Sequence, residues 1–182
     1  VKAPSYDPMT LLVLHEMLHE AGLPAGVAQC LTGKGALVGD LLVDDERIAC
    51  VNFTGSTEAG LSIARTAAKH LTDYKFELGG NDPFIVFSDA DMDLVIKEAE
   101  DQARNNRQCC TGSKRFIIHN SLKDEFVERL SAELDKLVIG NPMDSKVNMG
   151  PMIGERAAKT VEDQVNHTVS QGARIARGGK RN

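Results

Sequence analysis

Long apolar runs are absent from this 182-residue sequence: the longest, such as LLVL and FIVF, fall far below the ~20 residues of a membrane-spanning helix. Charge of one sign is also scarce, because the net charge is −5 and no run of like charges occurs. Proteins that bind nucleic acid or anionic membranes usually carry a basic patch. We therefore expect neither nucleic acid nor a membrane as a partner.

Paired cysteines are missing as well. The four cysteines show no CxxC spacing and no neighbouring histidine cluster, a pattern typical of a reduced, cytoplasmic protein. His15 and His19 stand four residues apart in HEMLH, like the ligands of a zincin, but no third ligand follows at the expected spacing. We therefore expect no metal site and two solvated helix histidines.

Strand-like and helix-like segments alternate along the chain. Short apolar runs bounded by glycine predict strands, and amphipathic periodicity between capping and stop signals predicts helices. The expected strands are 26–33, 47–55, 74–80, 83–87, 115–120 and, incompletely, 173–182; the expected helices are 8–24, 35–45, 56–71, 89–105, 121–137 and 155–172. This alternation predicts an α/β protein with parallel sheets, and Gly79-Gly80 is the expected boundary between two units.

Three segments could carry chemistry. In FTGSTEAG (53–60), a strand, a glycine turn and a helix start would present free backbone N–H groups to an anion such as a pyrophosphate, although most such turns are only structural. Glu77 ends an apolar strand, where partial desolvation would suit its carboxylate to proton transfer, unless it only bonds the backbone there. Cys109 and Cys110 lie in a polar loop, either as a reactive thiol or as small core residues.

Together these segments resemble the aldehyde dehydrogenase superfamily. FTGSTEAG, FELGGNDPFIVFSDADMD and RNNRQCCTGSKRF follow one another in the family's order and spacing, and KAPSYDPMT, AGLPAGV and LVIGNPMDSKVNMGPMI are similar to it as well. Within the superfamily, the sequence looks most like succinate-semialdehyde dehydrogenases. The resemblance implies a three-layer αβα fold with parts of two parallel-sheet domains. Residues 1–78 would end the NAD(P)-binding domain, and 79–182 would begin the catalytic domain.

The resemblance also implies catalytic roles. The glutamate of the family's ELGG motif falls on Glu77, a general base, and the nucleophile of its GQxC motif falls on Cys110, with Cys109 at the variable position. Cys110 would attack the aldehyde, hydride would pass to NAD or NADP, and water activated by Glu77 would release the acid. Arg104 would bind the far carboxylate of succinate semialdehyde. The cofactor-binding positions would be Lys2, Ser5, Gly55, Ser56, Gly60 and Leu78.

Two residues depart from the family's pattern. Arg107 replaces the glycine of GQxC, and its side chain could crowd the nucleophile loop. Ser5 stands where the family often has a glutamate that binds the adenosine ribose. Because that glutamate would repel a 2′-phosphate, Ser5 predicts that NADP is tolerated, with Lys2 as a compensating charge.

Parts of the family's pattern would lie outside the chain. An oxyanion-binding asparagine and the early nucleotide-binding strands would precede Lys2, and a ribose-binding glutamate and the oligomerising strands would follow Asn182. The whole enzyme is expected to be a homodimer or homotetramer acting on a small aldehyde, and this segment alone is expected to be inactive. The alternatives are a truncated, non-catalytic remnant or partner-binding module and, less favoured because Glu77 is present, an acylating enzyme that uses coenzyme A.

Overall fold

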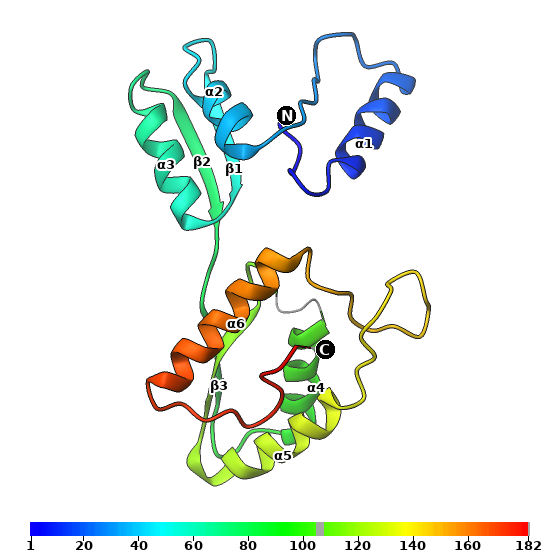
Figure 1. Cartoon of the computed structure of the whole chain (residues 1–182), viewed down its shortest axis with the longest axis vertical. Helices are drawn as coiled ribbons and strands as arrows, with labels where there is room; N and C mark the ends of the chain where they lie inside the picture. The colour runs from blue at the N-terminus through cyan, green and yellow to red at the C-terminus, as the bar shows by residue number, and fades with distance from the viewer. Residues whose placement is uncertain (105–107, 182) are drawn as a thin grey trace. The chain divides into compact units, whose positions relative to one another are not determined.

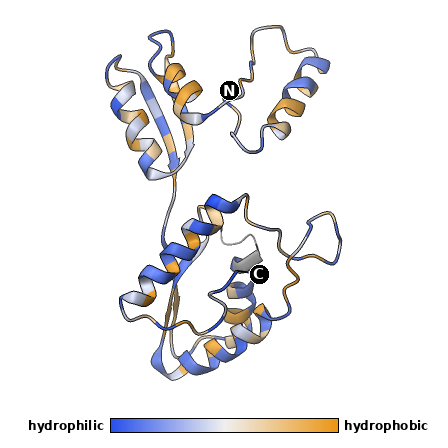
Figure 2. Cartoon of the chain, in the orientation of Figure 1, coloured by the Kyte–Doolittle hydropathy of each residue, from blue (hydrophilic) through white to orange (hydrophobic). Residues whose placement is uncertain are grey.

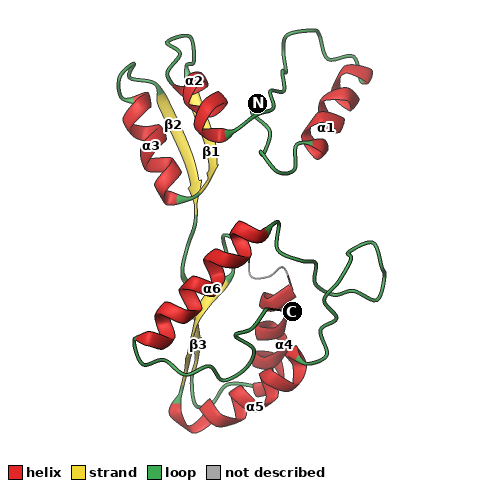
Figure 3. Cartoon of the chain, viewed as in Figure 1, coloured by secondary structure: helices red, strands yellow, loops and turns green. Residues whose placement is uncertain are grey.

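The computed structural model describes residues 1–104 and 108–181, without the side chains of Ala103 and Arg104. The chain forms two compact units, Val1–Gly79 and Gly80–Asn182. Each unit contains one two-stranded parallel sheet (Figure 3). The alternation of strands and helices in the sequence therefore correctly predicts parallel pairing.

The first unit is built around a strand–helix–strand arrangement. Its elements are α1 (Met9–Glu20), the π-helix η1 (Gly35–Gly39), α2 (Asp40–Val43), β1 (Cys50–Gly55), α3 (Thr57–Ala67) and β2 (Asp73–Leu78) (Figure 1). β1 and β2 pair in unbroken register from Cys50↔Asp73 to Gly55↔Leu78. α3 lies close to β2, because a Cβ built on the buried Gly60 would come within 2.9 Å of Leu78 Cδ2. A glycine at this position therefore permits close packing of the helix on the strand.

The second unit repeats this arrangement and adds further helices. Its elements are β3 (Asp82–Val86), α4 (Met92–Arg104), β4 (Ser113–Ile118), the 3₁₀-helix η2 (Asn120–Leu122), α5 (Lys123–Leu134) and α6 (Glu155–Ser170). Its core combines one strand with two helices: Val86 of β3, Val95, Ile96 and Ala99 of α4, and Phe126 of α5. Polar and apolar residues are mixed along these helices (Figure 2), as expected for helices with one buried face.

Two expected strands do not form. In 26–33, the only pairing described is an isolated bridge between Lys2 and Leu31. Gly26 and Gly33 adopt positive φ angles of 88° and 139°, so the segment begins and ends in conformations that strands do not use. The described part of 173–182 also lacks a strand, and three glycines in and beside it (Gly172, Gly178 and Gly179) have positive φ.

One histidine of α1 differs from the expectation. His15 is buried, only 8% exposed, and its Nδ1 lies 2.8 Å from the carbonyl oxygen of Leu11. His19 is exposed as expected. Leu11 and Leu18, four residues before and three residues after His15 on the same face of α1, are half-buried, so His15 lies on the helix face that packs inward. In the described part of the chain, no helix is long and apolar enough to cross a membrane, and no three metal-binding side chains cluster.

Candidate active site

The register of the second sheet brings two distant segments together. β3 and β4 run parallel with Asp82 opposite Ser113, so the residues that precede the two strands are neighbours. Gly80 therefore lies beside the loop that carries the two adjacent cysteines. A Cβ built on Gly80 would come within 3.2 Å of the carbonyl oxygen of Cys110. A side chain at this position would force its neighbours to shift by a few tenths of an ångström, so glycine suits this approach.

Hydrogen bonds fix the loop between Gln108 and β4. The N–H of Gly112 donates to the carbonyl of Cys109 at 3.1 Å and closes a turn. The ammonium group of Lys114 donates to the same carbonyl at 3.1 Å and to the carbonyl of Gly112 at 2.8 Å. Arg115 Nε donates to the carbonyl of Asn81 at 2.9 Å, which ties β4 to the segment after Gly80. The cysteines are thus presented from a turn with a defined backbone.

Both thiols of this loop are exposed, as chemistry with a substrate requires. The Sγ of Cys109 lies 3.2 Å from the hydroxyl oxygen of Thr111. Hydrogen bonds from the side chain and backbone N–H of Thr111, with smaller contributions from Cys110 and Gly112, lower the pKa of the Cys109 thiol. The thiol that the sequence assigns to the variable motif position is therefore itself activated.

Glu77 lies in β2 and is exposed, which makes the expectation of partial desolvation wrong for this chain. Side chains alternate along a strand, and the neighbours Phe76 and Leu78 point toward Gly60 of α3. Glu77 consequently projects from the sheet face that α3 does not cover. A carboxylate in this position can bind water without breaking an interaction of the strand.

The residues predicted for a phosphate site lie where β1 meets α3. Ser56 caps the helix, because its Oγ accepts a hydrogen bond from the N–H of Ala59 at 3.2 Å. The remaining N–H groups of the first turn have no partner within the helix, and the positive end of the helix dipole adds to them. Gly55 lies under the ring of Phe53, whose Cζ is 2.4 Å from a Cβ built there. Gly60 and Leu78 pack against each other, so their position serves the packing of α3 on β2.

The structure brings the other two predicted cofactor residues together. Lys2 Nζ donates to Ser5 Oγ at 3.2 Å, and Ser5 Oγ donates to the carbonyl of Gly33 at 3.1 Å. The single hydroxyl proton of Ser5 is thus already used, while the ammonium group keeps two further donors. A phosphate at this point would be bound by Lys2, and Ser5 would hold the lysine.

Two predicted features lie at or beyond the limits of the described structure. Arg104 is the last residue of α4, and its side chain lies outside the described part of the chain. Arg107 lies outside the described residues altogether.

Two positions gain importance only from the structure. Gly80 stands out in the sequence as half of a boundary, but its closeness to Cys110 depends on strand register. The sequence does not mark Lys114 as a functional residue, because a lysine next to an arginine at the start of a strand is common on protein surfaces. The parallel pairing of β3 with β4 is the feature that places Gly80 beside the loop of Cys110.

Comparison with known proteins identifies the same family over the full length of the chain. The profile of the "Aldehyde dehydrogenase family" matches residues 1–182. Glutarate-semialdehyde dehydrogenase of Pseudomonas putida is 39% identical over 181 residues, 99% of this chain and 38% of that protein. Succinate-semialdehyde dehydrogenase [NADP(+)] of Escherichia coli is 38% identical over 181 residues, with the same shares covered. The chain therefore spans about 38% of the length of these curated relatives.

Solved structures agree with the fold. Betaine aldehyde dehydrogenase of Staphylococcus aureus in complex with NAD+ has a TM-score of 0.95 and 34% identity, over 100% of this chain and 36% of that one. A lactaldehyde dehydrogenase structure has a TM-score of 0.93 and 38% identity, over 98% of this chain and 38% of that one. The predicted α/β fold, similar to that of the aldehyde dehydrogenases, is confirmed.

Proposed function

Because the chain belongs to the aldehyde dehydrogenase family, we propose that it forms part of an enzyme that oxidises an aldehyde to a carboxylic acid with NAD(P)+. The observation that carries this proposal is the closeness of Gly80 to the carbonyl of Cys110. It joins the segment that follows Glu77 to the loop that bears the nucleophile. In this proposal, Val1–Gly79 contributes to the cofactor-binding domain and Gly80–Asn182 to the catalytic domain.

The proposed chemistry takes place on Cys110. Its thiolate attacks the aldehyde carbon, loss of hydride leaves a thioester, and attack of water on the thioester releases the acid and restores the thiol. Glu77, three residues before Gly80 and exposed to solvent, takes the proton from that water. The N–H of Cys110 donates to the oxyanion that each attack creates.

The proposed cofactor is NAD or NADP, which accepts the hydride when bound. The donors present in the first unit fit a dinucleotide: N–H groups at the start of α3 suit its phosphates, and the ammonium group of Lys2 suits a ribose or a 2′-phosphate. The E. coli relative is named for NADP(+), and the S. aureus structure contains NAD+. Ser5→Glu should shift the cofactor preference toward NAD, which titration of both cofactors would measure.

The proposed substrate is an aldehyde with an acidic group at its far end, with succinate semialdehyde as the first candidate. Some relatives are named for glutarate semialdehyde, succinate semialdehyde and 3-sulfolactaldehyde, whose far ends are anionic, whereas others are named for lactaldehyde and betaine aldehyde, whose far ends are not. Arg104 would bind that anion. A charge-assisted bond of ~1.5–3 kcal/mol corresponds to roughly tenfold to a hundredfold selectivity over butanal. Arg104→Ala should remove this preference in kcat/KM, and an unchanged preference would exclude Arg104 from the site.

The decisive experiment compares the two cysteines in an enzyme that contains this segment. Cys110→Ala should abolish NAD(P)H formation from succinate semialdehyde, whereas Cys109→Ala should retain most of it. The opposite result would make Cys109, whose thiol is already activated, the nucleophile. If wild-type protein forms no NAD(P)H with any aldehyde, the chain is instead a non-catalytic relative of the family.

A further inference from the structure

We propose that Lys114 is a positioning residue for the cysteine loop: its ammonium group holds the carbonyls of Cys109 and Gly112 and strengthens the N–H of Cys110 as a donor to an oxyanion. This inference rests on the proposed function, because it requires Cys110 to be the nucleophile.

Lys114 is directed toward the loop by an irregularity in the sheet. The register passes from Asp82↔Ser113 to Pro83↔Arg115, so Lys114 is an extra residue without a partner in β3. Such a bulge re-aims a side chain. Pro83 has no N–H to donate, and the break in the ladder therefore costs little at this point. The side chain of Lys114 turns back over the preceding turn instead of continuing the alternation of β4.

The contacts of Lys114 complete the hydrogen bonding of one carbonyl group. The oxygen of Cys109 accepts from the N–H of Gly112 at 3.1 Å and from Lys114 Nζ at 3.1 Å, which occupies both of its lone pairs. The second bond of Nζ, to the oxygen of Gly112 at 2.8 Å, fixes the ammonium group over the turn. The cation therefore acts on the peptide group between Cys109 and Cys110.

That peptide group contains the N–H of Cys110. A cation bonded to the carbonyl end of an amide draws electron density from its nitrogen, and linked hydrogen bonds strengthen one another by roughly 10–30%. Loss of a whole oxyanion donor typically costs ~10²–10³ in rate. If the charge of Lys114 supplies roughly 10–30% of the free energy of that donor, its removal corresponds to roughly a twofold to eightfold loss of acyl-transfer rate.

Two reagents separate this effect from simple thiol reactivity. With p-nitrophenyl acetate, the Cys110 thiolate adds to the ester carbonyl, an oxyanion forms, and a C–S bond replaces the C–O bond as nitrophenolate leaves. With iodoacetamide, the same thiolate displaces iodide, and no oxyanion forms. Both rates would be measured at Cys110 on the 182-residue chain by mass spectrometry of the peptide 108–115. A Cys109→Ala background prevents transfer of the acetyl group to the neighbouring thiol.

Lys114→Met should lower the ratio of acylation to alkylation by roughly twofold to eightfold, and Lys114→Arg should restore it. The matched control is Lys136→Met, which removes another exposed lysine of the same unit, paired with Glu133 at 2.8 Å. An equal fall of both rates, or of the ratio in the control, would overturn the proposal. Absence of both reactions at Cys110 would also overturn it. Failure of the proposed function would appear separately, as aldehyde oxidation that survives Cys110→Ala.

Discussion

The two units share a strand–helix–strand plan, β1–α3–β2 and β3–α4–β4, but they bury it to different extents. Every residue of β1 and β2 is exposed or half-buried, whereas β3 contributes the buried Val86 to a continuous core. The difference lies in α5, whose Phe126 packs its ring 5.7 Å from that of Phe116 in β4. The first unit has no corresponding helix on its sheet among the described contacts.

This contrast shows which step of folding is local and which is not. A strand–helix–strand segment of about 30 residues sets the parallel pairing in both units. Burial requires a second helix, because one helix covers only part of a sheet face. Parallel sheets are normally covered on both faces, yet Ile85 and Ile117, on the face of β3–β4 opposite the core, are 56% and 51% exposed. Only one face of the second sheet is therefore buried.

The largest expected effect comes from the core of the second unit. Phe126→Ala should lower the free energy of unfolding by ~3–5 kcal/mol, because it removes a buried ring and leaves a cavity. Phe76→Ala in β2, where the ring is half-buried against Gly60, should cost about half as much. Urea unfolding followed by circular dichroism would measure both values.

A second probe assigns each loss to a unit. The sequence has no tryptophan, and its two tyrosines, Tyr6 and Tyr74, both lie in the first unit. If the units unfold independently, Phe126→Ala should leave the transition in tyrosine fluorescence unchanged, whereas Phe76→Ala should shift it. Equal effects of the two substitutions would show that the units differ less in packing than their burial indicates.

The next effect concerns two adjacent glycines. Gly80→Ala should destabilise the chain by about 1 kcal/mol and slow alkylation of Cys110, because the new methyl group would press on the Cys110 carbonyl and on Asp82. Gly79 has no heavy atom within 4 Å of a built Cβ, and its φ is not left-handed. Gly79→Ala should therefore be neutral or stabilise the chain by about 0.4–1 kcal/mol. If the two variants behaved identically, the contact between Gly80 and the loop of Cys110 would have no effect on stability or on the reactivity of that thiol.

The sequence predicts the elements better than it predicts their surroundings. Strands at 74–80, 83–87 and 115–120 and the helix at 155–172 form within a few residues of the expected bounds. Local periodicity determines them, and at the start of α3 the capping residue Ser56 adds to it. The strand expected at 26–33 fails because its terminal glycines adopt positive φ, a conformation that the glycine-bounded apolar pattern does not distinguish from a strand end.

Individual site residues were harder to predict. Glu77 was expected to be partly desolvated because it ends an apolar strand, but the side of the sheet covered by α3 decides its exposure. The position of Lys114 depends on a bulge opposite Pro83, which a sequence pattern does not reveal. Local sequence rules thus predict candidate reactive residues, while strand register determines that Gly80 lies beside the loop of Cys110.

A smaller effect is expected at the activated thiol of the second unit. Because Thr111 is the largest cause of the lowered pKa of Cys109, Thr111→Val should raise that pKa. The thiolate fraction below the raised pKa then falls, and alkylation of Cys109 near pH 7 should slow by roughly threefold to tenfold. Rates measured between pH 6 and 10 by mass spectrometry would give the midpoint. Thr111→Ser keeps the hydroxyl group and should keep the wild-type profile; a shift with serine would indicate a change in the turn.

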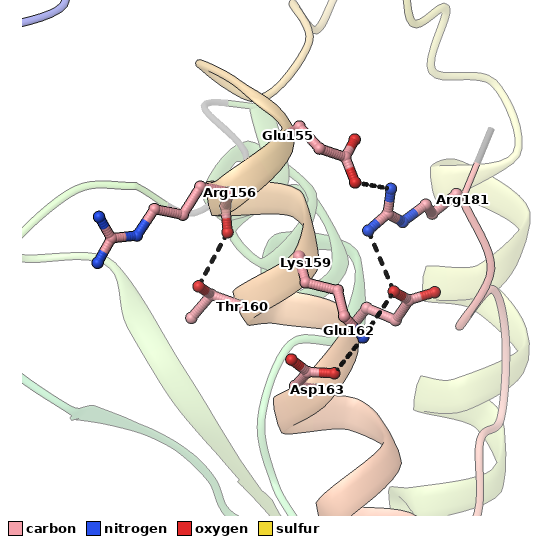
Figure 4. A network of polar contacts seen from close by, with 7 residues as sticks. All are labelled: Glu155, Arg156, Lys159, Thr160, Glu162, Asp163 and Arg181. Carbon is pink, nitrogen blue, oxygen red and sulfur yellow. Dashed lines mark hydrogen bonds and ion pairs between the residues drawn. The ribbon is translucent and has the colours of Figure 1, made fainter.

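The smallest effect is expected where the second unit depends on surface charges. Arg181 donates to Glu155 at 2.6 Å and to Glu162 at 3.1 Å, and so ties the end of the chain to α6, beside the pair Lys159–Asp163 (Figure 4). All of these groups are partly or largely exposed, and exposed ion pairs contribute little. Arg181→Gln should lower Tm slightly at low salt and have no effect at about 1 M salt, where the Debye length is ~3 Å.

The control is Arg156→Gln on α6, since the guanidinium group of Arg156 points away from the network in Figure 4. The destabilisation caused by Phe126→Ala should remain at high salt, because an apolar core is not weakened by screening. If the decrease in Tm caused by Arg181→Gln persisted at high salt, the contacts of Arg181 with α6 would stabilise the unit through packing. The contrast between surface ion pairs and the apolar core would then fail.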